Sequence, residues 1–252
     1  MSKSPSTADK VLDVLLLFQE SWPDLTAEEI CELIDAPRST TYRYIRILRE
    51  KGFLEKSATG GFRLGPRLLQ LGRIARSRLD ISDIALPVME DIARQTRETV
   101  LLTRLFGGNA VCVERIQGPQ TVRISFEIGQ VQPLHGGASS KILLAYVDEN
   151  EWDQHLTSRL ERFTEYTITE PEALKEQLRE IRHQGYCVSE SEVDLGARAV
   201  AVPIKNARGR VVAGLSTAGP VFRMDDDTVD HHLALLRSGA STIQDQLVAM
   251  GF

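Results

Sequence analysis

The 252-residue sequence predicts an α+β protein of two domains: a small helical domain with a β-hairpin, then a larger domain with an antiparallel sheet and flanking helices. Two observations predict this fold class. Residues 7–65 hold three short amphipathic helix patterns and a Gly-Gly turn, and from residue 98 onward strand-like runs alternate with helix patterns. We expect the first domain at 1–65, a linker helix at 66–80 and the second domain at 81–252.

The first two helices are predicted from apolar periodicity and from capping residues. A helix is expected over residues 7–20, with Thr7 as its N-cap and an end at Trp22-Pro23. Its apolar face comprises Val11, Leu15 and Phe18. A second helix is expected over 26–34, because Thr26 and Glu29 have the spacing of a capping box. Its buried stripe comprises Ala27, Ile30, Cys31 and Ile34.

The third helix and the hairpin complete a recognisable arrangement. Asp35-Ala36-Pro37 is long enough only for a turn, and the next helix is expected over 38–51, ended by Gly52 as its C′ residue. Two short apolar runs, 53–56 and 62–65, flank a turn over 57–61 and predict a β-hairpin. Three helices, a three-residue turn between the last two and a hairpin are the outline of a winged helix-turn-helix.

The third helix has the composition of a DNA-reading helix. Thr41, Ile45 and Leu48 are spaced to point inward, which turns short hydroxyls and arginines outward. A recognition helix presents its first residues to base edges, and arginine can bond guanine bidentately or contact phosphate. One of two tyrosines, 42 or 44, is expected to contact DNA and the other to close the core. The candidate DNA contacts are Arg38, Ser39, Thr40, Tyr42, Arg43 and Arg46, with Lys56 and Arg63 on the hairpin.

The charge distribution supports a nucleic-acid partner although the whole chain is acidic. The net charge is −5, but residues 38–78 contain eleven basic and two acidic side chains and therefore carry +9. Duplex DNA requires a basic face and not a basic protein. Taken alone, the same charges also fit a solvated helix surface with chance clustering.

The second domain is predicted from residue 66 onward. Pro66 begins a linker helix at its first position, and a further helix fits 84–96. Strand-like runs occur at 99–106, 110–116, 121–128, 186–189, 197–204 and 211–217. Helical runs occur at 138–146, 150–156, 172–184 and 228–250. Short turns between paired strands favour a largely antiparallel sheet.

Composition argues against several classes of protein. No stretch approaches a membrane helix, and the N-terminal residues contain no apolar region typical of a secretory signal. The three cysteines, at 31, 112 and 187, are far apart, which favours a reducing compartment over disulfides or a zinc site. We therefore expect a cytoplasmic protein with no membrane partner.

No catalytic motif is present, so we do not expect an enzyme. Ser139-Ser140-Lys141 lacks the serine three positions before the lysine that a Ser-x-x-Lys nucleophile requires, because that position is Ala138. The five histidines show no metal-ligand spacing, and we expect no cofactor and no metal. A third interpretation is an architectural DNA-binding protein without a ligand, or an oligomer-forming scaffold, and the size of the second domain counts against it. A second domain of about 170 residues is more than dimerisation requires.

The spaced motifs of the chain resemble the IclR-type (isocitrate lyase regulator) family of bacterial transcription factors, from about residue 7 to 248. In the first domain the resemblance rests on Pro37 to Arg43, Leu48, Gly52-Phe53-Leu54, Phe62 to Pro66 and Leu71-Gly72. In the second it rests on Pro133-Leu134-His135, Lys141, Leu144, Ala145, Gly185-Tyr186, Ser189, Glu190, Glu192, Gly196, Pro203 and Gly219-Pro220.

This resemblance implies a GAF-like sensor domain, dimers or dimers of dimers, and DNA affinity that a small organic effector modulates. A symmetric dimer would bind a palindromic operator. The resemblance also implies an effector site built from one helix start and later strands. Carried over by position, its residues are Leu134, Ala138, Ser139, Ser140, Ser189, Glu190, Ala199, Ser216 and Ala218.

The residues at this helix start suggest an acidic effector. Small side chains over 136–140 leave room above the helix N-terminus, where backbone N–H groups favour an anion, although such a run also fits a simple capping turn. Ala199 and Ala218 suit a less polar or bulkier effector, such as an aromatic acid. Glu190 and Glu192 would disfavour a second carboxylate or accept from a hydroxyl, and Glu192 fits an exposed loop charge equally well. Arg198 is expected to face away from the site.

Overall fold

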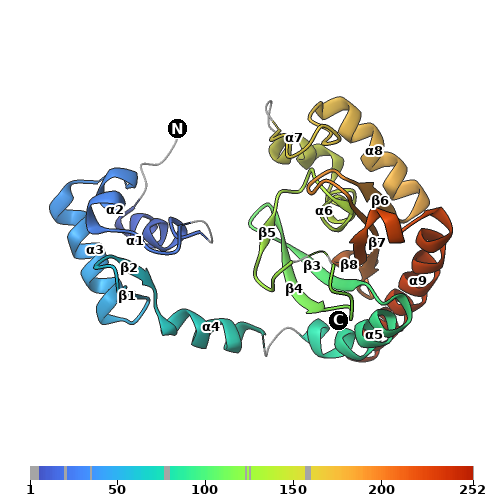
Figure 1. Cartoon of the computed structure of the whole chain (residues 1–252), viewed down its shortest axis with the longest axis horizontal. Helices are drawn as coiled ribbons and strands as arrows, with labels where there is room; N and C mark the ends of the chain where they lie inside the picture. The colour runs from blue at the N-terminus through green and yellow to red at the C-terminus, as the bar shows by residue number, and fades with distance from the viewer. Residues whose placement is uncertain are drawn as a thin grey trace. The chain divides into compact units, whose positions relative to one another are not determined.

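The computed structural model describes residues 6–19, 22–34, 36–76, 80–122, 124, 126–156 and 160–251. The chain divides into two compact units, Met1–Arg78 and Leu79–Phe252 (Figure 1). Each unit has its own hydrophobic core. Each is therefore described by itself.

Three helices form the first part of the N-terminal unit. They are α1 (Thr7–Leu16), α2 (Ala27–Leu33) and α3 (Arg38–Glu50). The expected capping box of Thr26 and Glu29 is confirmed at the start of α2. The expected N-cap of α1 is wrong, because Ser6 caps it in a box with Asp9, and α1 ends at Leu16 instead of residue 20. Ser6, unlike Thr7, has an acidic residue three positions later in the chain. The Ser6 hydroxyl accepts from Asp9 N–H, and the Asp9 carboxylate accepts from Ser6 N–H.

The hairpin and α4 complete this unit. Strands β1 (Leu54–Lys56) and β2 (Phe62–Leu64) pair antiparallel, with Glu55 opposite Arg63. Leu25 forms a β-bridge to Phe62, which fastens the hairpin to the segment before α2. The α4 helix spans Pro66–Arg76 and begins at Pro66, as the sequence predicts. The winged helix-turn-helix is confirmed.

The C-terminal unit is built on a six-stranded antiparallel sheet with strand order β5-β4-β3-β8-β7-β6. Its strands are β3 (Thr99–Phe106), β4 (Asn109–Ile116), β5 (Val131–Gln132), β6 (Cys187–Glu190), β7 (Ala197–Lys205) and β8 (Val211–Pro220). Alternation along each central strand sends one set of side chains to each face. On β8, for example, Leu215 enters the core beneath the long helices, while Ser216 faces α6.

Helices cover both faces of the sheet (Figure 1). The α5 (Asp80–Thr96) and α9 (Asp226–Ala249) helices pack together against one face and close the larger core. The α6 helix (Ala138–Leu144) lies against the other face, with α8 (Pro171–Gln184) packed on it. Shorter elements are η1 (Glu149–Glu151), α7 (Trp152–His155) and η2 (Val221–Arg223).

Two sequence predictions in this unit are wrong. The described residues of 121–128 form no strand, and β4 pairs instead with β5, which the sequence did not predict. The turn over 128–129 explains this difference, because Gly129 N–H donates to Cys112 O and Cys112 N–H donates to Gln130 O. These bonds place residues 130–132 beside β4. The α5 helix begins at Asp80 and not at residue 84.

Two kinds of feature are absent from the described residues. None of the described helices has the length and apolar composition needed to cross a membrane. In the same residues, no group of three or more His, Cys, Asp or Glu side chains could hold a metal ion.

Candidate DNA-binding surface and effector cavity

The α3 helix separates an inner and an outer face as the sequence predicts. Thr41, Ile45 and Leu48 are buried, and Tyr44 is the tyrosine that joins them in the core. Tyr42 is exposed, as are Ser39, Arg43 and Arg46, while Thr40 is half-buried. No side chain caps the start of α3, whose N-cap is Pro37. The positive end of the helix dipole is thus open to an anion.

Acidic neighbours hold several of the exposed basic side chains. Glu28 on α2 lies 3.5 Å from Arg38 and accepts a 3.1 Å hydrogen bond from the Tyr42 hydroxyl, which raises the pKa of Tyr42. Arg46 lies 3.8 Å from Glu50, and Arg63 lies 2.7 Å from Glu55. Among the described residues, no ion pair is recorded for Arg43 or Lys56. All of these pairs are exposed, so each costs little to exchange for a phosphate.

A concave surface joins α3 to the β1–β2 hairpin, which is the wing of the winged helix-turn-helix. It is lined by the start of α2, the outer face of α3 and the hairpin, including Ser39, Tyr42, Arg43, Arg46 and Lys56. The remaining candidates, Arg38, Thr40 and Arg63, lie outside its lining. Five of the eight predicted DNA contacts therefore share one concavity with an excess of positive charge.

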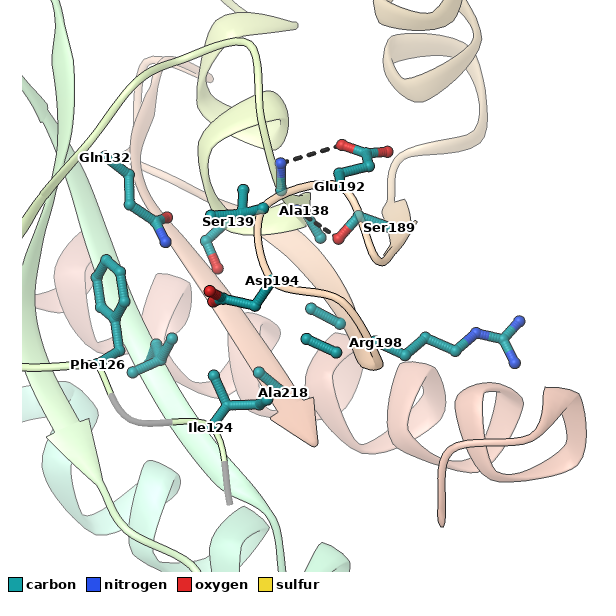
Figure 2. Close-up of a pocket in the computed structure, with 15 residues that line it drawn as sticks. Ile124, Phe126, Gln132, Ala138, Ser139, Ser189, Glu192, Asp194, Arg198 and Ala218 are labelled. Atoms are coloured by element: carbon teal, nitrogen blue, oxygen red, sulfur yellow. Dashed lines mark hydrogen bonds between the residues drawn. The ribbon is translucent and has the colours of Figure 1, made fainter. Parts of the chain in front are cut away.

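A separate cavity of about 60 Å³ lies on the α6 face of the sheet (Figure 2). Its apolar wall comprises Leu101, Ile124, Phe126, Ala199 and Ala218. Its polar wall is formed by the start of α6, the end of β6 and the loop over 191–196. In the sheet register, Ala199 on β7 lies opposite Ser189 on β6 and opposite Ala218 on β8. Three neighbouring strands therefore contribute one residue each to the same part of the cavity lining.

Three neutral donors face the polar end of this cavity. The Ser139 hydroxyl pairs with that of Ser216 at 2.8 Å, which can leave the Ser139 proton for the cavity. The Ser189 hydroxyl accepts from Ala138 N–H at 2.9 Å and therefore keeps its own proton to donate. The Gln132 carbonyl accepts from Ser140 at 3.2 Å, so its amide N–H₂ also remains.

Two backbone N–H groups at the start of α6 are already bonded within the protein, which the sequence did not predict. Glu192 accepts from Gly137 N–H at 3.1 Å, and Ser189 accepts from Ala138 N–H. Glu192 is buried, contrary to its reading as an exposed loop charge, and forms an ion pair with Lys141, which is completely buried. The loop after β6 thus supplies one anion to the start of α6.

The cavity brings together part of the predicted effector site. Ala138, Ser139, Ser189, Ala199 and Ala218 line it. Leu134, Ser140 and Ser216 are buried and do not line it, and Glu190 is exposed and paired with Arg198. Arg198 runs away from the cavity, as alternation predicts, and its guanidinium contacts Asp226 and Met224 O (Figure 2).

Sequence reasoning found Ala199 and Ala218 of the apolar wall but missed Leu101, Ile124 and Phe126, and it missed Gln132 and the loop residues Val193 and Asp194. Ile124 and Phe126 lie in the segment predicted as a strand, and the loop contains no motif. The alternating apolar residues of 121–128 were the available signal, because Ile124 and Phe126 are two of them and line the cavity although the segment has no strand partner.

Comparison with known proteins identifies the family of both units. A family model described as "Bacterial transcriptional regulator IclR C-terminal" matches residues 74–245, and one described as "IclR helix-turn-helix domain" matches residues 7–58. The chain belongs to the IclR family. It is a DNA-binding transcriptional regulator and not an enzyme, because its IclR relatives are named as transcriptional regulators.

The alignments with known relatives extend over nearly the whole of this chain. The regulator KipR of Bacillus subtilis is 34% identical over 96% of this chain and 97% of its own length. The regulator KdgR of Escherichia coli is 30% identical over 98% of this chain and 95% of its own. A crystal structure of an IclR homologue from Microbacterium hydrocarbonoxydans, complexed with 4-hydroxybenzoate, has a TM-score of 0.81 at 30% identity, covering 97% of this chain and 100% of that one.

Proposed function

We propose that this regulator binds its operator through α3 and the wing, and that a small organic acid bound in the α6 cavity modulates this affinity. The observation that carries the effector half is the convergence of three neutral donors, from Ser139, Ser189 and Gln132, at one end of a cavity with an apolar wall. A carboxylate accepts several hydrogen bonds, and an apolar or aromatic body fits the opposite wall.

The DNA half of the proposal assigns eight side chains to the operator. Arg43 and Arg46 on α3 would read base edges or phosphates, and Lys56 and Arg63 on the wing would contact the adjacent backbone. Ser39 and Thr40 would donate at the open start of α3, beside Arg38 and Tyr42. The exposure of Arg43 and its lack of a recorded ion pair among the described residues make it the strongest base-reading candidate.

We further propose a homodimer, or a dimer of dimers, on a palindromic operator. Support comes from large apolar side chains exposed on α1 and α4: Leu12 is 59% exposed, Leu16 76% and Leu69 79%. Several exposed leucines on two helices of one small unit are typical of a surface that a second subunit covers. Two recognition helices related by a twofold axis would reach half-sites about one helical turn apart.

The lining of the cavity supports a one-ring effector. An apolar cavity of about 150 Å³ holds benzene, so a cavity of about 60 Å³ must widen by side-chain movement to accept even one ring. The complex of an IclR homologue with 4-hydroxybenzoate supports the same size class. The aromatic wall of Phe126 and the small Ala199 and Ala218 suit such a ring.

The proposal is tested with an operator selected from random duplex DNA and a panel of monocyclic aromatic and short aliphatic acids. We expect at least one acid to change operator affinity in a fluorescence anisotropy titration, and to raise the melting temperature by mass action. Ala199→Leu, which fills the cavity, should remove the acid response and retain DNA binding. The matched control Ala207→Leu lies in an exposed turn and should respond normally. An unchanged response in Ala199→Leu would exclude this cavity as the effector site.

A further inference from the structure

Ile124 and Phe126 are the part of the apolar cavity wall that lies outside the sheet (Figure 2). The other apolar wall residues, Leu101, Ala199 and Ala218, belong to β3, β7 and β8. Backbone hydrogen bonds between neighbouring strands hold those three residues in place. Ile124 and Phe126 belong to no strand, so other contacts must decide where this part of the wall stands.

Two contacts act on these wall residues directly. The Thr99 hydroxyl, on β3, donates to Ile124 O at 3.3 Å. Phe126 is buried in a small apolar cluster with Leu101 and Cys112. Both contacts come from β3 and β4, and neither acts on the backbone that precedes Ile124.

An ion pair holds the backbone that leads into the wall. Arg223, in η2, donates to Glu98 through Nε at 2.6 Å and through Nη2 at 2.9 Å. The same Nη2 donates to Val122 O at 2.8 Å, two positions before Ile124. Because Nη2 carries two hydrogens, one can serve Glu98 while the other serves Val122. Arg223 therefore links the wall to η2 and to the residue that precedes β3.

The Glu98 side of this pair is built into the fold. Glu98 is only 3% exposed, and a Cβ at Gly219 would come within 2.6 Å of its Oε2. Residue 219 must therefore lack a side chain if the carboxylate is to keep its position. A bidentate carboxylate fixes the orientation of the guanidinium, whereas desolvation offsets much of the contribution of a buried pair to stability. The pair thus acts chiefly on geometry, by directing the remaining Nη2 hydrogen at Val122 O.

A fixed wall limits how far the cavity can widen. At about 60 Å³, the cavity must gain volume to accept even one ring. While Val122 O stays bonded to Arg223, this gain must come mainly from side chains. A second fused ring would require the backbone of the wall to move, and that movement would break the bond from Arg223.

We propose that Glu98 and Arg223 are positioning residues that hold Ile124 and Phe126 in place and so restrict the α6 cavity to effectors of one ring or less. This inference rests on the proposed function, because it assumes that the cavity binds the effector. Extra carbon atoms forced against an apolar wall that cannot retreat reduce affinity by about tenfold or more.

The test compares acids of increasing bulk. Dissociation constants of propionate, benzoate and 2-naphthoate, each with one carboxylate, are measured by calorimetry on the full-length protein. We expect the wild type to bind benzoate at least about tenfold more tightly than 2-naphthoate. The ratio of these two constants is the size preference, which a loss of stability alone does not change.

Two variants remove the bond to the wall. Glu98→Gln together with Arg223→Met removes the donor to Val122 O without leaving a buried charge unpaired. The size preference of this double variant should fall below about threefold, because the wall can then retreat. Arg223→Lys keeps a charge beside Glu98 but lacks the planar fork that aims a second donor at Val122 O, so it should lower the size preference as well.

Arg182→Met is the matched control. Arg182 also donates to two backbone carbonyls, Ala145 O at 2.6 Å and Val147 O at 2.7 Å, and it lies 3.1 Å from Glu149. None of these four residues lines the cavity. Arg182→Met removes a similar set of bonds and should keep the size preference of the wild type.

The size preference decides the outcome. An unchanged preference in the double variant would overturn the inference and leave the cavity as the effector site, and if the double variant does not fold, the same result in Arg223→Lys overturns it. Equal binding of both ring acids by the wild type, or an equal loss of preference in Arg182→Met, would overturn it too. Absence of binding by all three acids would overturn the proposed function itself, and the inference with it.

Discussion

At the scale of single residues, Arg43 gives the sharpest prediction for DNA binding. It is exposed in the concavity between α3 and the wing. We expect Arg43→Ala to weaken operator binding by about 1–3 kcal/mol and to relax base preference at one position, because a bidentate base contact would be lost. Fluorescence anisotropy with the operator and with single-base variants measures both effects.

The control for this prediction is Arg94→Ala, which removes an exposed arginine from α5 in the other unit. It should leave operator affinity unchanged. Acid binding, followed by calorimetry, should be the same in both variants. If Arg43→Ala binds the operator as tightly as the wild type, Arg43 does not contact DNA.

His232 makes the stability of the C-terminal unit depend on pH. It is buried on α9, where its Nδ1 lies 3.1 Å from the Thr217 hydroxyl, and burial lowers its pKa from 6.5 to about 4, with a smaller effect from His231. The stabilisation from the neutral imidazole is complete above pH 6.5 and is lost as the pH falls toward 4, because the unfolded state takes up the proton first. At about 1.4 kcal/mol per pKa unit, the loss is roughly 3 kcal/mol.

Urea unfolding at pH 7 and pH 4.5 tests this effect. Trp22→Phe leaves the buried Trp152 as the reporter of the C-terminal unit, since the sequence contains two tryptophans. His232→Gln in that background should lose much of the pH dependence. A variant that retains the full wild-type dependence would assign the effect to other groups.

Residue roles could be predicted from the sequence only where neighbours along the chain decide them. The inward stripe of Thr41, Ile45 and Leu48 follows from helix periodicity, and the structure confirms it. The partner of the α6 start could not be predicted, because Glu192 reaches Gly137 from 55 positions away. A pattern within one helix cannot show that a distant loop supplies its capping anion.

At the scale of elements, capping and alternation predicted most helices and strands. The α2 helix followed from Thr26 and Glu29, and β3 was predicted with both of its ends. The strand predicted over 121–128 was wrong although its sequence alternates. Alternation reports that one side of a segment is buried, and here Ile124 and Phe126 are directed at a cavity wall and not at a sheet partner.

Two glycines next to the wing give a matched prediction. A Cβ at Gly65 would lie 2.4 Å from Gly52 O, where the end of α3 meets the start of α4, whereas a Cβ at Gly72 within α4 would meet nothing within 4 Å. Gly65→Ala should therefore destabilise the N-terminal unit by about 1–3 kcal/mol, and Gly72→Ala should stabilise α4 by about 0.5–1 kcal/mol.

Native-state hydrogen exchange separates these two effects. Gly65→Ala should accelerate exchange in α3 and the hairpin, and Gly72→Ala should slow exchange in α4. Thermal unfolding followed by circular dichroism gives the sign of each change. Equal stability of Gly65→Ala and the wild type would mean that the α3–α4 junction relaxes without cost.

At the scale of the whole molecule, charge is divided between the two units. Residues 1–78 contain 13 basic and 10 acidic side chains, and residues 79–252 contain 17 and 25, which gives net charges of +3 and −8. The net charge of −5 therefore conceals a basic unit that can bind DNA. The sequence alone predicted the basic segment at 38–78, because charge counting does not depend on the fold, and the structure supplies the boundary between the units.

This division leads to the last prediction, a steep dependence of operator binding on salt. In the proposed dimer, the basic side chains of α3 and the wing would displace condensed cations at about six to ten phosphates, so affinity should fall by about 10³- to 10⁵-fold between 50 and 200 mM salt. Lys56→Ala, which removes a wing cation with no recorded ion pair among the described residues, should reduce the slope by about one per subunit and weaken all duplexes similarly. Arg43→Ala should instead weaken binding to the operator more than binding to random DNA.

Anisotropy titrations at four salt concentrations, with the operator and with a scrambled duplex, distinguish these contributions. A flat salt response would contradict a phosphate-binding role for this basic surface, because neutral contacts alone release no counterions.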